Sequence, residues 1–284
     1  MHKYKVGIVG AGTMGKQLAF LCASRGIPVV IWNYNLKANF AKDFNRLALV
    51  QSKLGHVSRE ALSGISENVS HTDDISLVAN CNILIEAVRE DKAVKASILR
   101  TLDDVATGGK IIATNTSTLS ITELAATTKN AARFLGMHFF NPPMAMKLVE
   151  VVKGEHTSED TVLAATEFLL VLGKSPMVLP ETPGFVVNRL LFPMINEAMF
   201  LLSEGVSDAK TIDRCMQMGA NHPMGPLELA DLIGLDVCLS ILETLVEETG
   251  DGKYRPAPLL KKYVRAGKLG RKAGIGFYSY RAKA

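Results

Sequence analysis

The first 180 residues alternate between short apolar runs and longer stretches in which apolar residues recur every three or four positions. Short apolar runs predict buried strands, and the longer stretches predict amphipathic helices. This alternation is typical of an α/β domain with a doubly wound, largely parallel sheet, because the connecting helices cover parallel strands on both faces. The predicted strands cover residues 5–9, 28–32, 81–88, 110–115, 132–139, 147–154 and 176–180.

The pattern changes near Pro183, after which apolar residues keep a helical spacing. One helical stretch covers residues 181–217, and a second helix covers residues 225–248 with Pro226 in its first turn. No convincing strand follows Pro180 in this pattern. We therefore expect a sheet-containing domain over residues 1–182 and an all-helical domain over residues 183–284.

Residues 40–68 separate the second predicted strand from the next and contain two helical patterns around Gly55. This segment is long for a simple crossover connection between parallel strands. It predicts a helical hairpin inserted into the first domain, which we expect to reach over a bound ligand.

Composition narrows the class of protein without choosing a function. The chain has 284 residues, a net charge of +4 and a pI of about 8.8, which suits anionic small molecules and is too weakly basic to indicate nucleic acid. No signal pattern or bilayer-spanning run is present, so we expect a cytoplasmic protein without a membrane partner. Four widely spaced cysteines predict reduced core thiols and no metal site: Cys22, Cys81, Cys215 and Cys238.

A GxGxxG motif at residues 10–15 follows the first predicted strand and opens a helix pattern. In this context the motif indicates a Rossmann-type dinucleotide site, since glycines allow a tight turn, close approach to a pyrophosphate and close helix packing. The helix N-terminus adds N–H groups and a partial positive charge. The alternative is a glycine-rich turn without a ligand. The predicted cofactor contacts here are Gly10, Gly12, Thr13, Met14 and Gly15.

A histidine stands near the end of another predicted strand, in the stretch MHFFNPPMAMKLVE. Glu150 follows His138 after twelve positions. Imidazole titrates near neutral pH, and a carboxylate on one ring nitrogen can orient it for proton transfer. From the residues alone, His138 is either a catalytic base with its carboxylate partner or a core histidine that Glu150 stabilises.

Seven motifs resemble one known family and run in order along nearly the whole chain. They are GAGTMG, IEAVRED, NTSTLSIT, MHFFNPP with MKLVEVV, GFVVNRLL, NHPMGPLELADLIGLD and GIGFYSY. Together they resemble the L-3-hydroxyacyl-CoA dehydrogenases, most closely the short bacterial 3-hydroxybutyryl-CoA dehydrogenases. The resemblance implies an oxidoreductase of fatty acid and butanoate metabolism that interconverts (S)-3-hydroxyacyl-CoA and 3-ketoacyl-CoA with NAD or NADP. It also implies a helical dimerisation domain and hence a homodimer.

In this family pattern His138 is the catalytic base and Glu150 its partner. Ser117 and Asn188 take the positions that hydrogen-bond the substrate oxygen near His138. The alternatives are a helix N-cap for Ser117 and a satisfied buried amide for Asn188. Because Asn188 belongs to the second domain, the resemblance implies an active site in the cleft between the domains.

The resemblance also implies contacts to cofactor and to coenzyme A. It places Glu90 and Lys95 by the nicotinamide-side ribose and phosphates, although the stretch REDKAVK also suits a solvated, charged helix start. Asn141 touches the cofactor or orders its loop, and Asn115 joins the cofactor contacts. Basic side chains should follow the coenzyme A phosphates. The candidates are Lys42, Lys53 and the basic tail from residue 261 to 284, for which a solvated helix face is the alternative.

Asn33 departs from the family, whose NAD-dependent members carry an acidic residue after the second strand to accept hydrogen bonds from the ribose. An amide keeps an acceptor but lacks the charge that would repel a 2′-phosphate. Tyr34, Asn35 and Lys37 follow it and add donors and a cation. We therefore expect NADP(H) to be accepted at least comparably to NAD(H); the alternative is an ordinary NAD enzyme in which asparagine replaces the acid.

Three other functions fit parts of the pattern. The first two are dehydrogenases of 3-hydroxyadipyl-CoA and of a free hydroxy or sugar acid. The third is a nucleotide-binding protein without turnover, which has no need of the combined set of Ser117, His138, Glu150 and Asn188. The 6-phosphogluconate-like dehydrogenases share the glycine-rich opening but use a lysine base, and GFVVNRLL contains no lysine.

Overall fold

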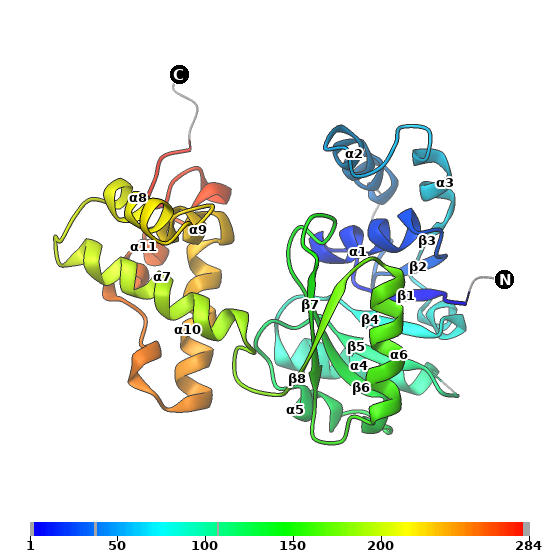
Figure 1. Cartoon of the computed structure of the whole chain (residues 1–284). Coiled ribbons are helices and arrows are strands. Elements are labelled where there is room, and N and C mark those ends of the chain that lie inside the picture. Colours follow the sequence, from blue (N-terminus) through cyan, green and yellow to red (C-terminus); the bar gives the residue numbers. More distant parts are fainter. Residues whose placement is uncertain (1–2, 37–38, 107, 281–284) are drawn as a thin grey trace. The chain divides into compact units, whose positions relative to one another are not determined.

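The computed structural model describes residues 3–36, 39–106 and 108–280, which form two units that meet in the chain at Glu181 and Thr182 (Figure 1). The first unit is built on one eight-stranded sheet in the order β3-β2-β1-β4-β5-β6-β7-β8. The strands are β1 (Val6–Val9), β2 (Val29–Trp32), β3 (Val69–Thr72), β4 (Ile83–Glu86), β5 (Ile111–Thr114), β6 (Phe134–Phe139), β7 (Leu148–Lys153) and β8 (Ser175–Pro180).

Every neighbouring pair in this sheet is parallel except β6 with β7, which is antiparallel. The predicted doubly wound, largely parallel sheet is therefore confirmed. The sequence prediction missed β3, whose four residues, VSHT, are half polar and less buried than the central strands. An edge strand such as β3 has a partner on one side only, so its sequence lacks the continuous apolar run of a central strand.

Alternate residues of a strand point to opposite faces of the sheet, and in this unit both faces carry apolar side chains that helices cover. Ile83 and Ile85 of β4 join a core cluster that contains residues of α1 and α6, whereas Leu84 between them is equally buried on the other face. The helices of this unit are α1 (Thr13–Ser24), α2 (Phe40–Lys53), α3 (Leu62–Glu67), α4 (Lys92–Val105), α5 (Ile121–Ala125) and α6 (Glu159–Val171).

Helices α2 and α3 flank Gly55, as expected for the inserted hairpin. Aromatic rings attach α2 to the rest of the unit: between ring centroids, Phe44 lies 6.0 Å from Phe20 of α1, and Phe40 lies 4.2 Å from His71 of β3. The opposite side of α2 is exposed and carries both Lys42 and Lys53. That the hairpin reaches over a ligand remains a prediction.

The second unit consists of helices around its own apolar core. The single helix predicted over residues 225–248 is wrong, because Gly234 adopts a φ of 110° and divides it into two helices. L-residues with side chains rarely adopt that backbone conformation, so the glycine sets the break. The helices are α7 (Val187–Ser203), α8 (Ala209–Gly219), α9 (Pro226–Ile233), α10 (Leu235–Thr249) and α11 (Pro258–Arg265). Within the described ranges, no helix is long and apolar enough to cross a membrane.

The motif GIGFYSY closes the second unit around a buried carboxylate. Asp231 of α9 accepts hydrogen bonds from the backbone N–H groups of Phe277 and Tyr278, at 3.0 and 2.9 Å, and from the Tyr280 hydroxyl at 3.1 Å. Burial raises the pKa of Asp231. A Cβ atom on Gly276 would lie 1.9 Å from Oδ1 of Asp231, so only glycine lets the chain pass this carboxylate.

Three of the four cysteines are buried thiols, as expected, and no two of them are paired in a disulfide. Burial raises the pKa of Cys22 and of Cys238 to about 12, and that of Cys81 to about 11. The prediction is wrong for Cys215, which is exposed on α8. Apolar neighbours in sequence do not ensure burial on an amphipathic helix, because they point around its axis in different directions.

Candidate active site

The glycine-rich loop lies at the carboxyl end of β1, and its three glycines have different surroundings. A Cβ atom on Gly10 would lie 2.7 Å from the Ala87 carbonyl oxygen, and one on Gly15 would lie 1.8 Å from the Gly10 carbonyl oxygen. Gly12 has no neighbouring atom within 4 Å of the corresponding point. Gly10 and Gly15 therefore permit close packing, whereas Gly12 leaves room beside the first turn of α1. That is the arrangement a dinucleotide pyrophosphate requires.

A hollow of about 450 Å³ adjoins this loop, close to where the strand order reverses between β1 and β4. Open α/β sheets bind ligands at such a reversal, outside the carboxyl ends of the strands. Its walls are mainly apolar and suit an adenosine group. They comprise Gly10, Trp32, Asn33, Tyr34, Val88, Ala93, Val94, Ser97 and Ile98.

Asn33 lies at the end of β2 with its side chain turned toward the glycine-rich loop. Its Oδ1 accepts a hydrogen bond from the Ala11 backbone N–H at 3.3 Å, and its Nδ2 donates to the Asn35 carbonyl at 2.8 Å. The side chain thus orders the cofactor loop without bringing a negative charge to the hollow. Tyr34 beside it is 81% exposed, whereas Lys37 lies outside the described residues.

His138 and Glu150 stand directly opposite each other on the antiparallel strands β6 and β7. Nδ1 of His138 lies 2.7 Å from Oε2 of Glu150, and the two side chains are 6% and 1% exposed. The Phe140 ring packs beside the imidazole, with ring centroids 4.5 Å apart. A buried carboxylate at Nδ1 fixes the tautomer and makes Nε2 the nitrogen that can exchange a proton with a substrate.

The Ser117 loop follows β5 at the same edge of the sheet. Ser117 is half-buried, and its backbone N–H donates to Oε1 of Glu90 at 2.7 Å. The N-cap alternative for Ser117 is wrong, because Ser120 is the residue whose side chain caps α5. Asn188, in the second unit, is the second residue of α7 and is 6% exposed.

Lys95 does not lie on a solvated helix start, because its side chain is fully buried. Its ammonium donates to both carboxylate oxygens of Glu86, each at 2.9 Å, and lies 3.3 Å from Oε2 of Glu90. Direct contact of Lys95 and Glu90 with a cofactor remains a prediction. Sequence analysis missed Glu86, although an acidic residue within the apolar run NILIEAV was a signal that it has a buried partner.

Asn115 and Asn141 hold the chain just after His138. Oδ1 of Asn115 accepts from the Phe139 backbone N–H at 3.0 Å, and Oδ1 of Asn141 accepts from Nε2 of Gln17 at 3.0 Å. A further residue that the sequence prediction missed is Lys174, whose buried ammonium donates to the carbonyl oxygens of Pro143 and Met146. Burial lowers the pKa of Lys174. These contacts order the loop that follows β6.

The basic side chains proposed for coenzyme A lie in different settings. Lys42 and Lys53 are exposed on α2. In the basic tail, Arg271 and Lys272 form ion pairs with Glu228 and Asp236, at 2.7 and 2.6 Å, and residues 281–284 lie outside the described range. Those pairs favour a structural role for this part of the tail.

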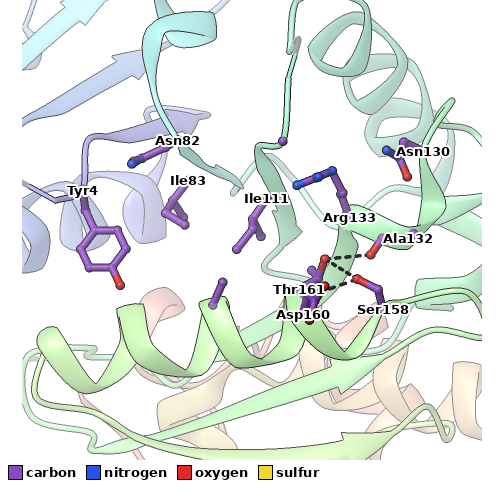
Figure 2. A pocket seen from close by; sticks show the side chains of 12 residues that line it. Tyr4, Asn82, Ile83, Ile111, Asn130, Ala132, Arg133, Ser158, Asp160 and Thr161 are labelled. Atoms are coloured by element: carbon purple, nitrogen blue, oxygen red, sulfur yellow. Dashed lines mark hydrogen bonds between the residues drawn. The ribbon is translucent and has the colours of Figure 1, made fainter.

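A second hollow, of about 510 Å³, lies at the opposite, amino-terminal edge of the sheet (Figure 2). Its polar groups largely bond to one another: Thr161 donates to the Ala132 carbonyl at 2.8 Å, and the hydroxyls of Ser158 and Thr161 are 2.9 Å apart. None of the predicted site residues lines it. The glycine-rich loop and His138 lie instead at the carboxyl-terminal edge of the sheet.

Known proteins match this chain over its whole length. Residues 5–182 match the model of the 3-hydroxyacyl-CoA dehydrogenase NAD binding domain, and residues 184–280 match that of the C-terminal domain. The chain is 46% identical to a 3-hydroxybutyryl-CoA dehydrogenase of Bradyrhizobium diazoefficiens, over 98% of this chain and 95% of the relative. It is 43% identical to a probable 3-hydroxybutyryl-CoA dehydrogenase of Bacillus subtilis, over 100% and 99% of the two chains.

Its structure is similar to the crystal structure of (S)-3-hydroxybutyryl-CoA dehydrogenase PaaH1 from Ralstonia eutropha, with a TM-score of 0.93 and 42% identity. That similarity covers 98% of this chain and 99% of the Ralstonia chain. The resemblance drawn from the seven motifs is confirmed by these matches. The chain belongs to the 3-hydroxyacyl-CoA dehydrogenase family.

Proposed function

We propose that the protein interconverts (S)-3-hydroxyacyl-CoA and 3-ketoacyl-CoA, with 3-hydroxybutyryl-CoA and acetoacetyl-CoA as its short-chain pair. The observation that carries this proposal is the buried pair of His138 and Glu150, 2.7 Å apart at the sheet edge that also carries the glycine-rich loop. A histidine that only stabilised the core would not have to lie at the sheet edge that carries the glycine-rich loop. The names of the relatives from Bradyrhizobium and Bacillus support the short acyl chain.

The residues divide the work of an alcohol oxidation. When bound, the nicotinamide accepts the hydride, so the protein itself has to take the proton from the hydroxyl. His138 takes that proton at Nε2, and Glu150 stabilises the imidazolium that forms. In the reverse direction, protonated His138 gives the proton to the keto oxygen. Ser117 and Asn188 orient that oxygen by hydrogen bonds.

The cofactor is NAD(H) or NADP(H), and we infer relaxed selectivity from Asn33. Its Oδ1 already accepts the Ala11 N–H, so the amide substitutes for the acid in ordering the loop. It differs from an acid in bringing no charge, and a 2′-phosphate would therefore meet less repulsion. An enzyme that uses asparagine in place of aspartate but still prefers NAD(H) is the alternative.

Substrate choice within the family depends on groups that meet coenzyme A and the acyl chain. Lys42 and Lys53 are exposed on α2, where cations can pair with phosphates.

A homodimer formed through the helical unit is part of the proposal, because that unit has exposed apolar side chains such as Val206 and Met218. The competing substrates are 3-hydroxyadipyl-CoA and a free hydroxy or sugar acid.

The test is reduction of acetoacetyl-CoA by NADH and by NADPH in parallel, with a free 3-keto acid as the competing substrate. His138→Gln should lower kcat by roughly a thousandfold while the Kd for NADH stays within about threefold of wild type. His156→Gln is the matched control, because His156 is exposed on a turn of the same unit. Near wild-type turnover by His138→Gln would refute the assignment, and turnover of the free acid alone would refute the substrate class.

A further inference from the structure

One buried ion pair lies beneath the candidate active site. The side chains of Lys95 and Glu86 are both 0% exposed, and the ammonium contacts both carboxylate oxygens at 2.9 Å. Glu86 also accepts from the Val88 N–H at 2.7 Å and from the Thr114 hydroxyl at 2.6 Å. The pair therefore joins the carboxyl ends of β4 and β5 to the first turns of α4. A buried charge with this many partners has little freedom to move.

Glu90 extends this pair to the loop after β5. Its Oε2 lies 3.3 Å from the Lys95 ammonium. Its Oε1 accepts from the backbone N–H groups of Ser117 and Thr118, at 2.7 and 3.3 Å, and from the Thr116 hydroxyl. One carboxylate thus has a buried cation on one oxygen and the backbone of residues 116–118 on the other.

We propose that Glu90 is a positioning residue, held by Lys95 and Glu86, that sets the backbone of residues 116–118 and thereby the place of the Ser117 side chain. The proposal rests on the proposed function, in which Ser117 orients the substrate oxygen. It gives Glu90 and Lys95 an action through the protein, beside the cofactor contact that the family pattern implies for them.

The geometry explains why a carboxylate is required at this position. Glutamine has one oxygen and one NH₂ group, so it cannot accept from the Ser117 N–H and face the Lys95 ammonium with oxygens on both sides. If the glutamine oxygen faces the loop, its NH₂ group faces the Lys95 ammonium. If the amide is reversed, the NH₂ group faces the N–H groups of Ser117 and Thr118. Either choice loosens or shifts the loop.

A double-mutant cycle of Glu90→Gln and Ser117→Ala tests the proposal in acetoacetyl-CoA reduction. A misplaced contact group costs on the order of ten- to a hundredfold in kcat, which we expect for Glu90→Gln alone. If Glu90 acts by placing the Ser117 side chain, Glu90→Gln should lower kcat by less than about threefold in the Ser117→Ala background. Ser117→Ala keeps the backbone N–H that Glu90 accepts, so the cycle isolates the hydroxyl.

Two readouts separate positioning from other roles. Hydrogen exchange of the Ser117 and Thr118 amides should be at least about tenfold faster in Glu90→Gln than in wild type, because glutamine cannot present an oxygen to the loop and another to the Lys95 ammonium, so the acceptor at the loop is less firmly held. The kcat at saturating NADH is the second readout, because saturation removes any change in the Kd for NADH from the comparison. Glu123→Gln on α5 is the matched control, since its carboxylate is exposed and pairs with Lys92; it should change neither readout.

The outcomes distinguish this proposal from the proposed function. Equal losses in kcat from Glu90→Gln in both backgrounds would overturn the positioning role. Unchanged exchange of the two amides would also overturn it. A wild-type protein that does not reduce acetoacetyl-CoA would overturn the proposed function, and this inference with it.

A second pair of variants tests the buried part. Lys95→Met should lower Tm strongly, because it leaves the Glu86 carboxylate buried without a countercharge. In Glu86→Gln combined with Lys95→Met the pair is neutral, so Tm should recover at least in part. Amide exchange at Ser117 should stay fast in that double variant, because Glu90 has lost its cation. A Ser117 amide that exchanges at the wild-type rate in the double variant would show that Lys95 does not hold Glu90. That result would overturn the part of the proposal that concerns Lys95 and Glu86.

Discussion

Replacing Glu150 by glutamine tests how much the carboxylate contributes to proton transfer. The substitution keeps the size of the side chain and one acceptor oxygen, but it removes the negative charge 2.7 Å from Nδ1 of His138. The charge matters when His138 is protonated, that is, after it takes the substrate proton. We therefore expect the variant to lose kcat while cofactor binding is retained.

The size of the loss follows from the burial of the pair. With charge centres about 4 Å apart and an effective dielectric constant of about 20, the attraction between imidazolium and carboxylate is about 4 kcal/mol. Glutamine retains a neutral hydrogen bond of about 1 kcal/mol. The remaining 3 kcal/mol corresponds to roughly a hundredfold in rate, since 1.36 kcal/mol is tenfold. Both side chains are at most 6% exposed, so solvent screens this attraction little.

The assay is steady-state oxidation of (S)-3-hydroxybutyryl-CoA at saturating NAD⁺, the direction in which His138 becomes protonated, with circular dichroism to verify the fold. Glu159→Gln is the control, because it makes the same chemical change at a carboxylate that is 74% exposed. It should keep wild-type kcat. A Glu150→Gln enzyme that folds normally and turns over within threefold of wild type would show that the carboxylate only supports the structure.

Three further predictions concern the cofactor loop and the residue that orders it. Gly12→Ala should keep a wild-type Tm but weaken NADH binding about tenfold or more, because its new methyl group occupies the space at the start of α1. Gly15→Ala should lower Tm by several degrees, since the methyl group would lie 1.8 Å from the Gly10 carbonyl oxygen. Calorimetry measures Tm, and fluorescence titration measures NADH binding. A loss of Tm in Gly12→Ala as large as that in Gly15→Ala would contradict the role given to Gly12. Asn33→Asp should shift the ratio of kcat/KM toward NADH over NADPH about tenfold or more, through repulsion of the 2′-phosphate. A wild-type protein that already rejects NADPH by several hundredfold would refute the role given to Asn33.

The short apolar runs along the chain predicted most strands of the sheet. The central strands are buried on both faces, so their apolar runs identified them along the chain. The edge strand β3 was missed because its sequence, VSHT, need not be apolar on its exposed side. Gly234 was read as an ordinary helical position, because its positive φ is a property of the folded backbone that the apolar pattern does not carry.

The candidate site could be predicted where a residue type alone suggests chemistry. His138 and Glu150 were paired in the sequence hypothesis and lie opposite each other in the structure. Glu86 and Lys174 were missed because their importance lies in contacts that only the fold creates. The apolar run around Glu86 indicated that it is buried, but the sequence could not show that Lys95 is its partner.

The antiparallel pairing of β6 and β7 makes the proton-transfer pair a local unit of the chain. Its two members are twelve positions apart, whereas the neighbouring strands β1 and β4 bring Lys5 beside Asn82 from 77 positions away. An insertion between residues 142 and 147 would lengthen the loop without changing which residues of β6 and β7 face each other, so the loop can vary in length while the pair stays aligned. A single-residue deletion inside either strand would instead turn one partner to the other face of the sheet.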